Sequence, residues 1–518
     1  MKNKLLIVFF FQNIFAQHDI PYDLLNQFGI NLSNNQIIWN TDQKFDNLLI
    51  DSSSRYFKQK FSSFDFNDIE IDSIYVKSKF KYEFGDYGLD ILNVGLKKHS
   101  KESDFQFIGL KKSFFGNYSE FADANSSPLS LFYKFDYSRK ISNHFFVFSV
   151  GYFQTSSNFL FDSIEDNSNN EEFSDFISLT LIDKFKKGSW NYMFGLNHIT
   201  KNDNIFMMEE SLDYDIDIER NIFEFNIDNN KYVSITSSID SKYYFDTKLL
   251  QNYNQNLFQL SNINSFKSSK IKYGFDYMED EVLPNFYYGM KHIFGNQTFS
   301  FLINRENKPT TFLFDNPNNQ KLETWDSINI DYLINFGLSL ETNLKWTEVS
   351  NLTAYDAVEN FFVSLSDDML SLKTRLEAPF NDRHSLYFTY YHNFHDSIIS
   401  SNRSNILDIN YEFKTSFVNE KLGVNGKISL IYLSENNSDF SFDYFRNIPS
   451  VGSSFTNDES YSVGLNLDIF IGDVILTLRA NNLLHRLPIN GDYSIKRHEL
   501  FNPINSLISF GILWEFDD

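Results

Sequence analysis

The C-terminal stretch "NPINSLISFGILWEFDD" has two faces with opposite character. Side chains alternate across an extended strand, so every second residue falls on the same face. One face is oily and aromatic, with Ile508, Phe510, Ile512, Trp514 and Phe516; the other carries Asn505, Ser509, Gly511 and Glu515. A soluble protein rarely ends on such a strand. An apolar face toward lipid and a small, polar face toward a lumen are what a strand of a transmembrane β-barrel requires.

The same alternation recurs along the chain from residue 74 onward. It is clear in "SIYVKSKFKYEF" (73–84), "LSLFYKFDYS" (129–138), "ILDINYEFKTSF" (406–417) and "YSVGLNLDIF" (461–470). We predict about 22 strands between residues 74 and 516. An even number brings both chain ends to the periplasmic side. Backbone groups in a bilayer must all be paired, so the last strand must pair with the first, near 74–84.

The breaks between these segments are of two kinds. Short connections are predicted at 139–143, 185–189, 228–230, 267–270, 294–297, 335–337, 380–383, 418–421 and 471–473. Longer polar loops are predicted between them at 156–172, 201–219, 306–323, 351–365, 435–458 and 485–503. This pattern of short periplasmic turns and long extracellular loops is typical of outer-membrane barrels. A soluble β-sandwich or propeller, the alternative, would have turns of similar length and an inward apolar face.

Composition narrows the choice further. The chain has 58 Phe and 29 Tyr but only 20 Gly, and it shows no apolar run long enough for a membrane helix after its N-terminus. The mean hydropathy of −0.35 is compatible with a barrel, whose strands are apolar on one face only. A net charge of −23 disfavours a nucleic-acid partner, and the absence of cysteine excludes disulfides and thiolate metal sites.

The N-terminus predicts where the chain goes. "MKNKLLIVFFFQNIFAQ" has basic residues, a short apolar core and Ala16, which indicates a signal peptide over residues 1–16. An N-terminal anchor helix is the alternative, but the core is short for a span. We therefore expect a short periplasmic or partial-plug segment at 17–73, a barrel at 74–516, and location in the outer membrane of a Gram-negative-type bacterium.

The C-terminus also resembles the signal that the bacterial barrel-assembly machinery reads on final strands. That signal has a polar residue, a Gly and two aromatics, which correspond here to Ser509, Gly511, Trp514 and Phe516. Two further residues, Asp517 and Asp518, follow the aromatic residue that is usually last. The resemblance implies that the bilayer and the assembly machinery are partners of this chain.

Two other stretches resemble the barrel of TonB-dependent receptors. The family's external Asn-Pro-x-Leu-Lys-Pro-Glu-Thr element is similar to the segment containing Asn316, Pro317, Lys321, Glu323 and Thr324, with one extra residue and no second Pro. "LTLRANNLLHRLPI" (476–489) is similar to the family's penultimate strand and its Asn-Leu turn. The resemblance covers residues 300–516 and implies a barrel of about 22 strands that takes up a solute.

The chain departs from that family at its N-terminal side. Residues 17–73 are too short for the family's plug, and no Gly-rich "RGP…YG" stretch is present. Energised uptake would then need a separate plug or an energy-transducing protein. We expect incomplete closure of the lumen, because strand side chains cannot fill a barrel of this width. Residues 17–73 or inward-folding loops such as 435–458 would supply what closure there is.

No enzyme site is predicted. The ten histidines give no ligand set: His384 and His392 share a face but stand about 26 Å apart along a strand. The acidic segment with Glu209, Glu210, Asp213, Asp215 and Asp217 has the ligand type for calcium, but a solvated external loop is the simpler interpretation. No catalytic residue, metal site or cofactor is assigned.

The predicted function is an outer-membrane transporter or receptor for an unidentified solute. The alternatives are a passive porin-like channel and a structural or surface-binding barrel without transport. Inward positions of mixed sign are expected to line water: Lys77, Lys79, Lys134, Asn410, Glu412, Lys414, Asn425, Lys427 and Arg479.

Overall fold

The computed structural model describes residues 75–113, 129–158, 171–207, 212–229, 233–246, 251–266, 268–309, 322–356, 358–359, 361–398, 404–417, 422–443, 448–486 and 506–517. Two short 3-10 turns occur, η2 (Asp86–Gly88) and η3 (Leu483–Arg486). The strands are β1 (Tyr75–Gly85), β2 (Asp90–His99), β3 (Ser103–Ser113), β4 (Leu129–Ile141), β5 (His144–Asn158), β6 (Glu171–Lys187), β7 (Trp190–Met207), β8 (Leu212–Asp228), β9 (Val233–Asp246), β10 (Gln251–Ser265), β11 (Ser269–Met278), β12 (Glu281–Phe294), β13 (Gln297–Pro309), β14 (Leu322–Asn335), β15 (Ser339–Asp356), β16 (Phe361–Asn381), β17 (His384–Asn393), β18 (Asn405–Phe417), β19 (Leu422–Leu433), β20 (Asn436–Asp443), β21 (Ile448–Asn457), β22 (Ser460–Ile471), β23 (Val474–Asn481) and β24 (Leu507–Asp517).

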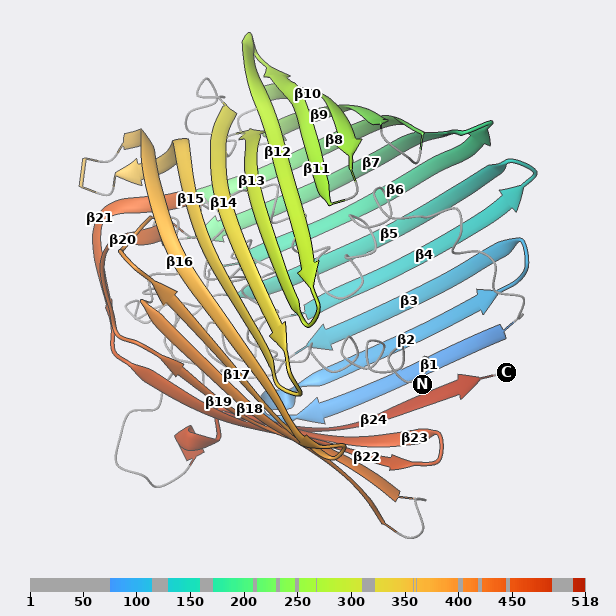
Figure 1. Ribbon diagram of the computed structural model, residues 1–518, viewed down its shortest axis with the longest axis vertical. Helices are drawn as coiled ribbons and strands as arrows, with labels where there is room; N and C mark the ends of the chain where they lie inside the picture. The colour runs from blue at the N-terminus through green and yellow to red at the C-terminus, as the bar shows by residue number, and fades with distance from the viewer. Residues whose placement is uncertain are drawn as a thin grey trace.

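Twenty-two of these 24 strands form one closed ring (Figure 1). Each strand in the ring is antiparallel to the next. β19 pairs directly with β22, so the hairpin β20–β21 is not one of the strands of the ring. The ring closes where β1 pairs with β24, from Lys77 opposite Asp517 to Gly85 opposite Ser509. The predicted barrel, its strand number and its closure between last and first strand are confirmed.

The barrel has two different ends. We call the end that holds Tyr75, Asp517 and the connection between β4 and β5 the turn end, and the opposite end the loop end. At the turn end, two-residue turns occur at 142–143, 188–189, 295–296, 382–383 and 472–473. Four of these turns contain a residue with positive φ: Ser142, Gly188, Gly295 and Gly472, with φ of 56°, 64°, 60° and 60°. These turns coincide with predicted short connections.

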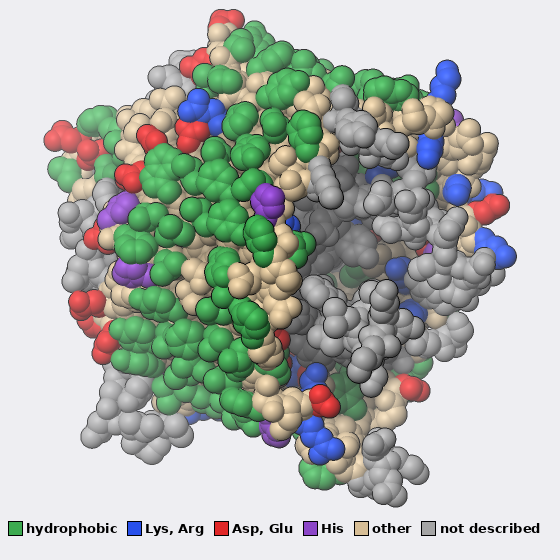
Figure 2. Space-filling view, in the orientation of Figure 1, with side chains coloured by type: hydrophobic (Ala, Val, Ile, Leu, Met, Phe, Trp, Pro, Cys, Tyr) green, Lys and Arg blue, Asp and Glu red, His purple; other side chains and the backbone are tan. Residues whose placement is uncertain are grey.

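The outward face of the wall is apolar. On β24, Phe510, Trp514 and Phe516 are 51 %, 42 % and 39 % exposed, whereas Ser509 on the inward face is 1 % exposed. Figure 2 shows hydrophobic side chains gathered in a broad band over the strands nearest the viewer. A closed wall with an apolar exterior and a polar interior is a transmembrane β-barrel.

Several predicted loops are strand instead. The segment predicted as a loop at 201–219 belongs mostly to β7 and β8, and 351–365 belongs mostly to β15 and β16. The segment 435–458 holds β20 and β21. These strands are longer than a span needs: a transmembrane strand takes about 9–11 residues, whereas β16 has 21.

The polarity of the two faces inverts where the long strands leave the membrane. On β8, Phe223 faces outward and is 52 % exposed, but Asp217 on the same face nearer the loop end is solvent-exposed. The neighbouring residue Ile216, on the inward face, is only 4 % exposed. The outer face thus becomes polar and the inner face apolar, because water replaces lipid outside while other protein segments cover the inside.

Among the described residues, no helix has the length and apolar character needed to cross a membrane. The signal peptide predicted at 1–16 and the segment predicted at 17–73 lie outside the described residues, as do Glu209 and Glu210.

Candidate functional site: the lumen and its mouth

The inward wall carries charges that are neutralised locally. Lys81 contacts Glu83 at 2.9 Å on β1, Lys134 contacts Asp136 at 3.1 Å on β4, and Arg479 of β23 contacts Asp468 of β22 at 2.5 Å. The first two pairs are buried, and hydroxyls complete them: the Ser149 and Ser509 side chains donate to Asp136 and Glu83 at 2.5 Å. Partners on both sides offset the desolvation cost of such charges. The predicted inward positions Lys134, Asn410, Glu412, Lys427 and Arg479 lie on this face.

One inward carboxylate ties four strands together. Asp276 of β11 is 1 % exposed. It accepts hydrogen bonds from the side-chain amides of Gln259 at 3.1 Å, Asn285 at 2.8 Å and Asn307 at 2.8 Å, on β10, β12 and β13. Because its oxygens are already occupied by donors from the wall, Asp276 is a structural group and not a free ligand for solute.

Toward the loop end, the inward surface becomes apolar. Leu257, Met278 and Leu322 form one buried cluster there. A second cluster consists of Val349, Leu352 and Ala354 of β15, Met369 of β16, and Ile398, with Trp325, Val363, Leu365 and Val451 packed against it. Apolar surface inside a water-filled barrel is stable only when something covers it, and two segments do so at the second cluster.

The first covering segment is residues 394–398, which we call the mouth segment. β17 ends at Asn393, opposite Ser371, so residues 361–370 of β16 have no strand beside them on that edge. The mouth segment lies along this free edge: the backbone N–H of Phe394 donates to the Leu370 carbonyl at 3.0 Å, and His395 Nε2 donates to the Asp368 carbonyl at 2.8 Å. The segment then turns inward.

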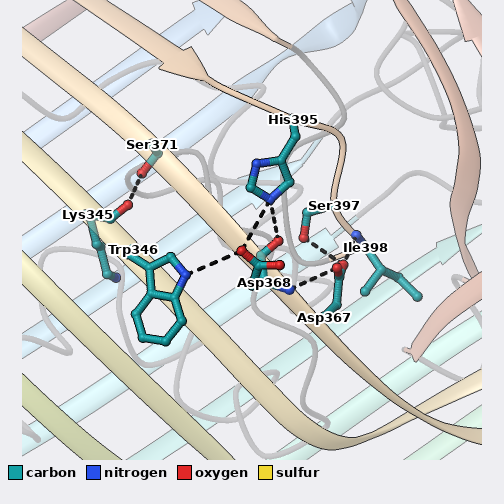
Figure 3. Close-up of polar contacts among 8 residues, drawn as sticks. All are labelled: Lys345, Trp346, Asp367, Asp368, Ser371, His395, Ser397 and Ile398. Carbon is teal, nitrogen blue, oxygen red and sulfur yellow. Dashed lines mark hydrogen bonds and ion pairs between the residues drawn. The ribbon is translucent and has the colours of Figure 1, made fainter.

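Asp367 holds the inward end of the mouth segment (Figure 3). Its Oδ2 accepts hydrogen bonds from Ser397 Oγ at 2.7 Å and from the Ile398 backbone N–H at 2.6 Å. The neighbouring Asp368 faces outward, where its Oδ2 accepts from Trp346 Nε1 at 3.3 Å. The Asp367 contacts place Ile398, which is 2 % exposed, in the apolar cluster. Asp367 thus fixes the inward end of the segment, whereas the Asp368 carboxylate makes only an exposed contact with its start, 3.6 Å from His395 Nε2.

The second covering segment is the hairpin β20–β21. β21 pairs in parallel with the tip of β15, with Tyr355 opposite Ser450 and Asp356 opposite Val451. Val451 packs against the same cluster as Ile398. Gly452 follows with φ of 78°, and a Cβ there would lie 2.7 Å from Val358 Cγ2, so this position requires glycine. Part of the predicted loop 435–458 therefore does cover the inner side of the mouth.

The residues that resembled the assembly signal lie together at the seam. Ser509 contacts β1 through Glu83, and Gly511 lies where a Cβ would come within 2.6 Å of Thr477 Oγ1 and 3.0 Å of the Tyr82 carbonyl. The Trp514 and Phe516 rings are 4.4 Å apart on the outward face at the turn end. Their role in assembly stays a prediction.

Of the five residues that resembled the receptor family's loop element, the structure describes only two. Asn316, Pro317 and Lys321 lie outside the described residues, whereas Glu323 and Thr324 begin β14 at the loop end. Glu323 is 2 % exposed and accepts from Trp325 Nε1 at 3.2 Å; Thr324 donates to Asn307 at 3.1 Å.

The sequence analysis predicted neither the mouth segment nor the role of Asp367 in holding it.

No group of three or more potential metal ligands is assembled within the described parts of the chain. His384 and His392 are each engaged in the wall, with Tyr411 at 2.7 Å and Asn405 at 2.9 Å. Of the acidic segment, Asp215 and Asp217 are strand residues that accept from Asn202 at 3.0 and 3.1 Å.

Solved structures with a similar fold include an iron transporter and two receptors. The FrpB iron transporter from Neisseria meningitidis superposes with a TM-score of 0.64 at 10 % identity, covering 86 % of this chain and 82 % of that one. The ferripyoverdine receptor of Pseudomonas aeruginosa gives 0.63 at 9 % identity, covering 86 % and 72 %. The siderophore receptor PirA from Acinetobacter baumannii gives 0.61 at 8 % identity, covering 86 % and 81 %. The similarity is one of fold, and it agrees with the resemblance to TonB-dependent receptors seen in the sequence.

No protein-family description matches the sequence, and no curated protein is similar to it at a significant level.

Proposed function

We propose that this chain is an outer-membrane transporter or receptor of the TonB-dependent type, through which a solute crosses a mouth that can open. The turn end faces the periplasm and the loop end faces the exterior, as in other outer-membrane barrels. The observation that carries the proposal is the covered mouth, where Asp367 holds residues 394–398 on the inner side of β16. A receptor needs such structured surface at its outer end, whereas a passive pore does not.

The construction of the mouth supports opening without damage to the wall. The strands β15 and β16 pair with each other from Ser339 opposite Glu377 to Asp356 opposite Phe361, with one register shift between Val349 and Leu352. The mouth segment adds only a few bonds to this pair. It can therefore leave while the barrel stays closed, which is the behaviour of a gate.

Conductance in planar bilayers tests the proposal. The purified full chain should show low conductance, and Asp367→Ala should raise it by releasing the mouth segment. The matched control is Asp368→Ala, which removes the adjacent outward carboxylate and its exposed contact with His395 at 3.6 Å; it should change conductance far less, because exposed ion pairs contribute little. A large, steady conductance that Asp367→Ala does not change would instead support the porin-like channel. Silence in every variant would support a surface-binding barrel.

The similarity to receptors named for iron and siderophores supports an iron chelate as the solute class. The lumen offers cationic and aromatic groups together on β16 and β17: Lys373 Nζ lies 5.3 Å from the centre of the Tyr391 ring, and Arg375 lies 5.9 Å from that of Tyr387. An anionic aromatic chelate would suit such groups. Replacing Lys373 and Arg375 by Gln should weaken chelate binding measured by calorimetry, while Lys427→Gln on another part of the wall should not.

Whether uptake is energised depends on a partner. We propose that a separate plug or energy-transducing protein serves this barrel, because the chain resembles TonB-dependent receptors in its sequence and shares a fold with outer-membrane receptors. Solute uptake by cells should then stop when the proton gradient is collapsed. Uptake that continues unchanged would indicate passive passage.

A further inference from the structure

The outward face of the wall has an apolar groove that crosses six strands, from β4 to β9. Its volume is about 580 Å³. The exposed side chains in it include Phe146, Leu181, Phe194, Phe223 and Ile239, each between 42 % and 52 % exposed. An apolar opening of this size on the lipid side is a place where a single hydrocarbon chain can lie.

The groove follows the register of the strands. It lies between two rows of cross-strand partners: Tyr137, Phe148, Leu181, Leu196, Phe223 and Ile239 form one row, and Arg139, Phe146, Asp183, Phe194, Phe225 and Ser237 form the other. All of them except Arg139 line the groove. Five strand spacings make it about 24 Å long.

The direction of the groove matches a lipid chain. Rows run at right angles to strands that are tilted by about 35–45°, so the groove rises by about 15 Å along the barrel axis. That is half of the roughly 30 Å hydrocarbon core, which is one leaflet. The row is closest to the turn end on β4, where Arg139 lies two residues before the strand ends at Ile141, whereas on β9 Ser237 lies four residues from the turn-end start of the strand at Val233. Arg139 therefore stands at the interface end of the groove.

Aromatic rings border the groove on the side of the turn end. His144, Phe185 and Tyr192 stack across β5, β6 and β7 with ring centres 5.1 and 4.8 Å apart. His144 Nδ1 lies 3.1 Å from both carboxylate oxygens of Asp183. Two acidic residues line the groove, Asp183 and Glu224. The Glu224 side chain faces the lumen, and the Asp183 carboxylate is already engaged by the His144 ring. Stacked aromatic rings of this kind belong at the level of the lipid headgroups.

Exposed cationic side chains gather at the same place, on three strands at or beside the groove. Lys98, Arg139 and Lys187 face outward on β2, β4 and β6, are exposed, and make no ion pair with a described residue. The outward cations near the loop end are paired instead: Lys111 contacts Asp90 at 2.7 Å and Arg305 contacts Asp326 at 2.6 Å. In a chain of net charge −23, unpaired cations beside an apolar groove favour an anionic occupant.

We propose that this groove binds a phospholipid with an anionic headgroup in the periplasmic leaflet. Arg139 and Lys187 contact the phosphate, with Lys98 as a further cation beside it, and one acyl chain lies between the two rows. Ordinary snorkelling of basic residues to the interface would distribute them around the rim. Their gathering on β2, β4 and β6, next to the groove, indicates a site.

Retention of defined lipids in native mass spectrometry tests the site. The full chain is given equal amounts of dioleoyl phosphatidylglycerol and dioleoyl phosphatidylcholine in detergent, and the bound copies are counted. The parent should retain phosphatidylglycerol preferentially. Arg139→Gln plus Lys187→Gln should lower that preference about twenty-five-fold, since each cation near a charged lipid surface contributes about a factor of five.

Matched variants show whether the preference for phosphatidylglycerol depends on the cations beside the groove or on the net charge of the barrel. Lys111→Gln plus Arg305→Gln removes two outward cations near the loop end and should keep the preference. Arg139→Lys plus Lys187→Arg should also keep it. Asp183→Asn should increase it, because a repelling carboxylate is removed.

The groove itself is tested by Leu181→Trp, which should lower the number of lipids bound. Equal retention of the two lipids by the parent would overturn the proposal, as would a preference that survives Arg139→Gln plus Lys187→Gln. A lipid-free dimer of the parent would show that a second copy covers the groove instead. All variants should first be shown to be folded by heat-modified migration.

Discussion

Removing the Asp367 carboxylate should free the mouth segment by a predictable amount. The carboxylate accepts from Ser397 Oγ at 2.7 Å and from the Ile398 N–H at 2.6 Å. Hydrogen bonds to a charged group contribute about 1.5–3 kcal/mol each, so the two together contribute about 3–6 kcal/mol. Since about 1.4 kcal/mol corresponds to a factor of ten, Asp367→Ala should raise the open fraction of the segment by about 10² to 10⁴.

The absence of cysteine makes this measurable with a single reactive residue. Ile398→Cys places a thiol where the native side chain is 2 % exposed. A maleimide should label it slowly in the parent barrel, because labelling requires opening. In Ile398→Cys plus Asp367→Ala, labelling should accelerate by at least about a hundredfold, the lower limit of the hydrogen-bond estimate.

Two controls define the result. Phe394→Cys, at an exposed position of the same segment, should be labelled quickly with or without Asp367. Asp368→Ala should change the labelling of Cys at 398 little, because the Asp368 carboxylate contacts Trp346 and the exposed His395 at 3.6 Å, but not Ile398. Equal labelling rates with and without the Asp367 carboxylate would refute the view that it holds the segment in place.

Three further predictions concern the barrel as a whole. Tyr411→Arg, outward on β18, should lower the free energy of unfolding in lipid vesicles by about 2–4 kcal/mol if it meets the bilayer midplane, and Glu412→Arg on the inward face should have little effect; similar losses would contradict the assigned faces. Trp514→Ala plus Phe516→Ala should lower the yield of folded, heat-modifiable barrel, whereas an unchanged yield would mean that assembly does not read these rings. N-terminal sequencing of the outer-membrane fraction should begin at Gln17, and recovery of the chain as a soluble periplasmic protein would argue against membrane insertion.

The membrane part of the wall was predictable because lipid imposes a simple rule on it. Each spanning segment must alternate, as at Leu407, Ile409 and Tyr411 against Asp408 and Asn410. The turns follow from where alternation stops, and closure follows from the need to pair every backbone group. These features depend on neighbours in the sequence, so one chain is enough to recognise them.

The rule fails beyond the membrane, where water replaces lipid. Asp215 and Asp217 indicated a loop, yet they are strand residues whose outward side chains meet solvent. The mouth segment was missed because the contact between Asp367 and Ile398 joins residues 31 positions apart with no local pattern. One signal was present: near Met369 and Leu370, successive residues on both faces of β16 are apolar, which indicates that another segment covers the inner face.

The seam between β1 and β24 gives this barrel an order of assembly. Its contacts join the most distant parts of the ring, since Ser509 and Glu83 are 426 residues apart and Ile508 and Asp86 are 422 apart. Contacts of such separation form late, because the intervening chain must first be ordered. Until then β1 offers an unpaired edge that would pair with any other open strand. A copy lacking only β24 would therefore keep two unpaired strand edges, at β1 and β23, and would aggregate and not insert into the membrane.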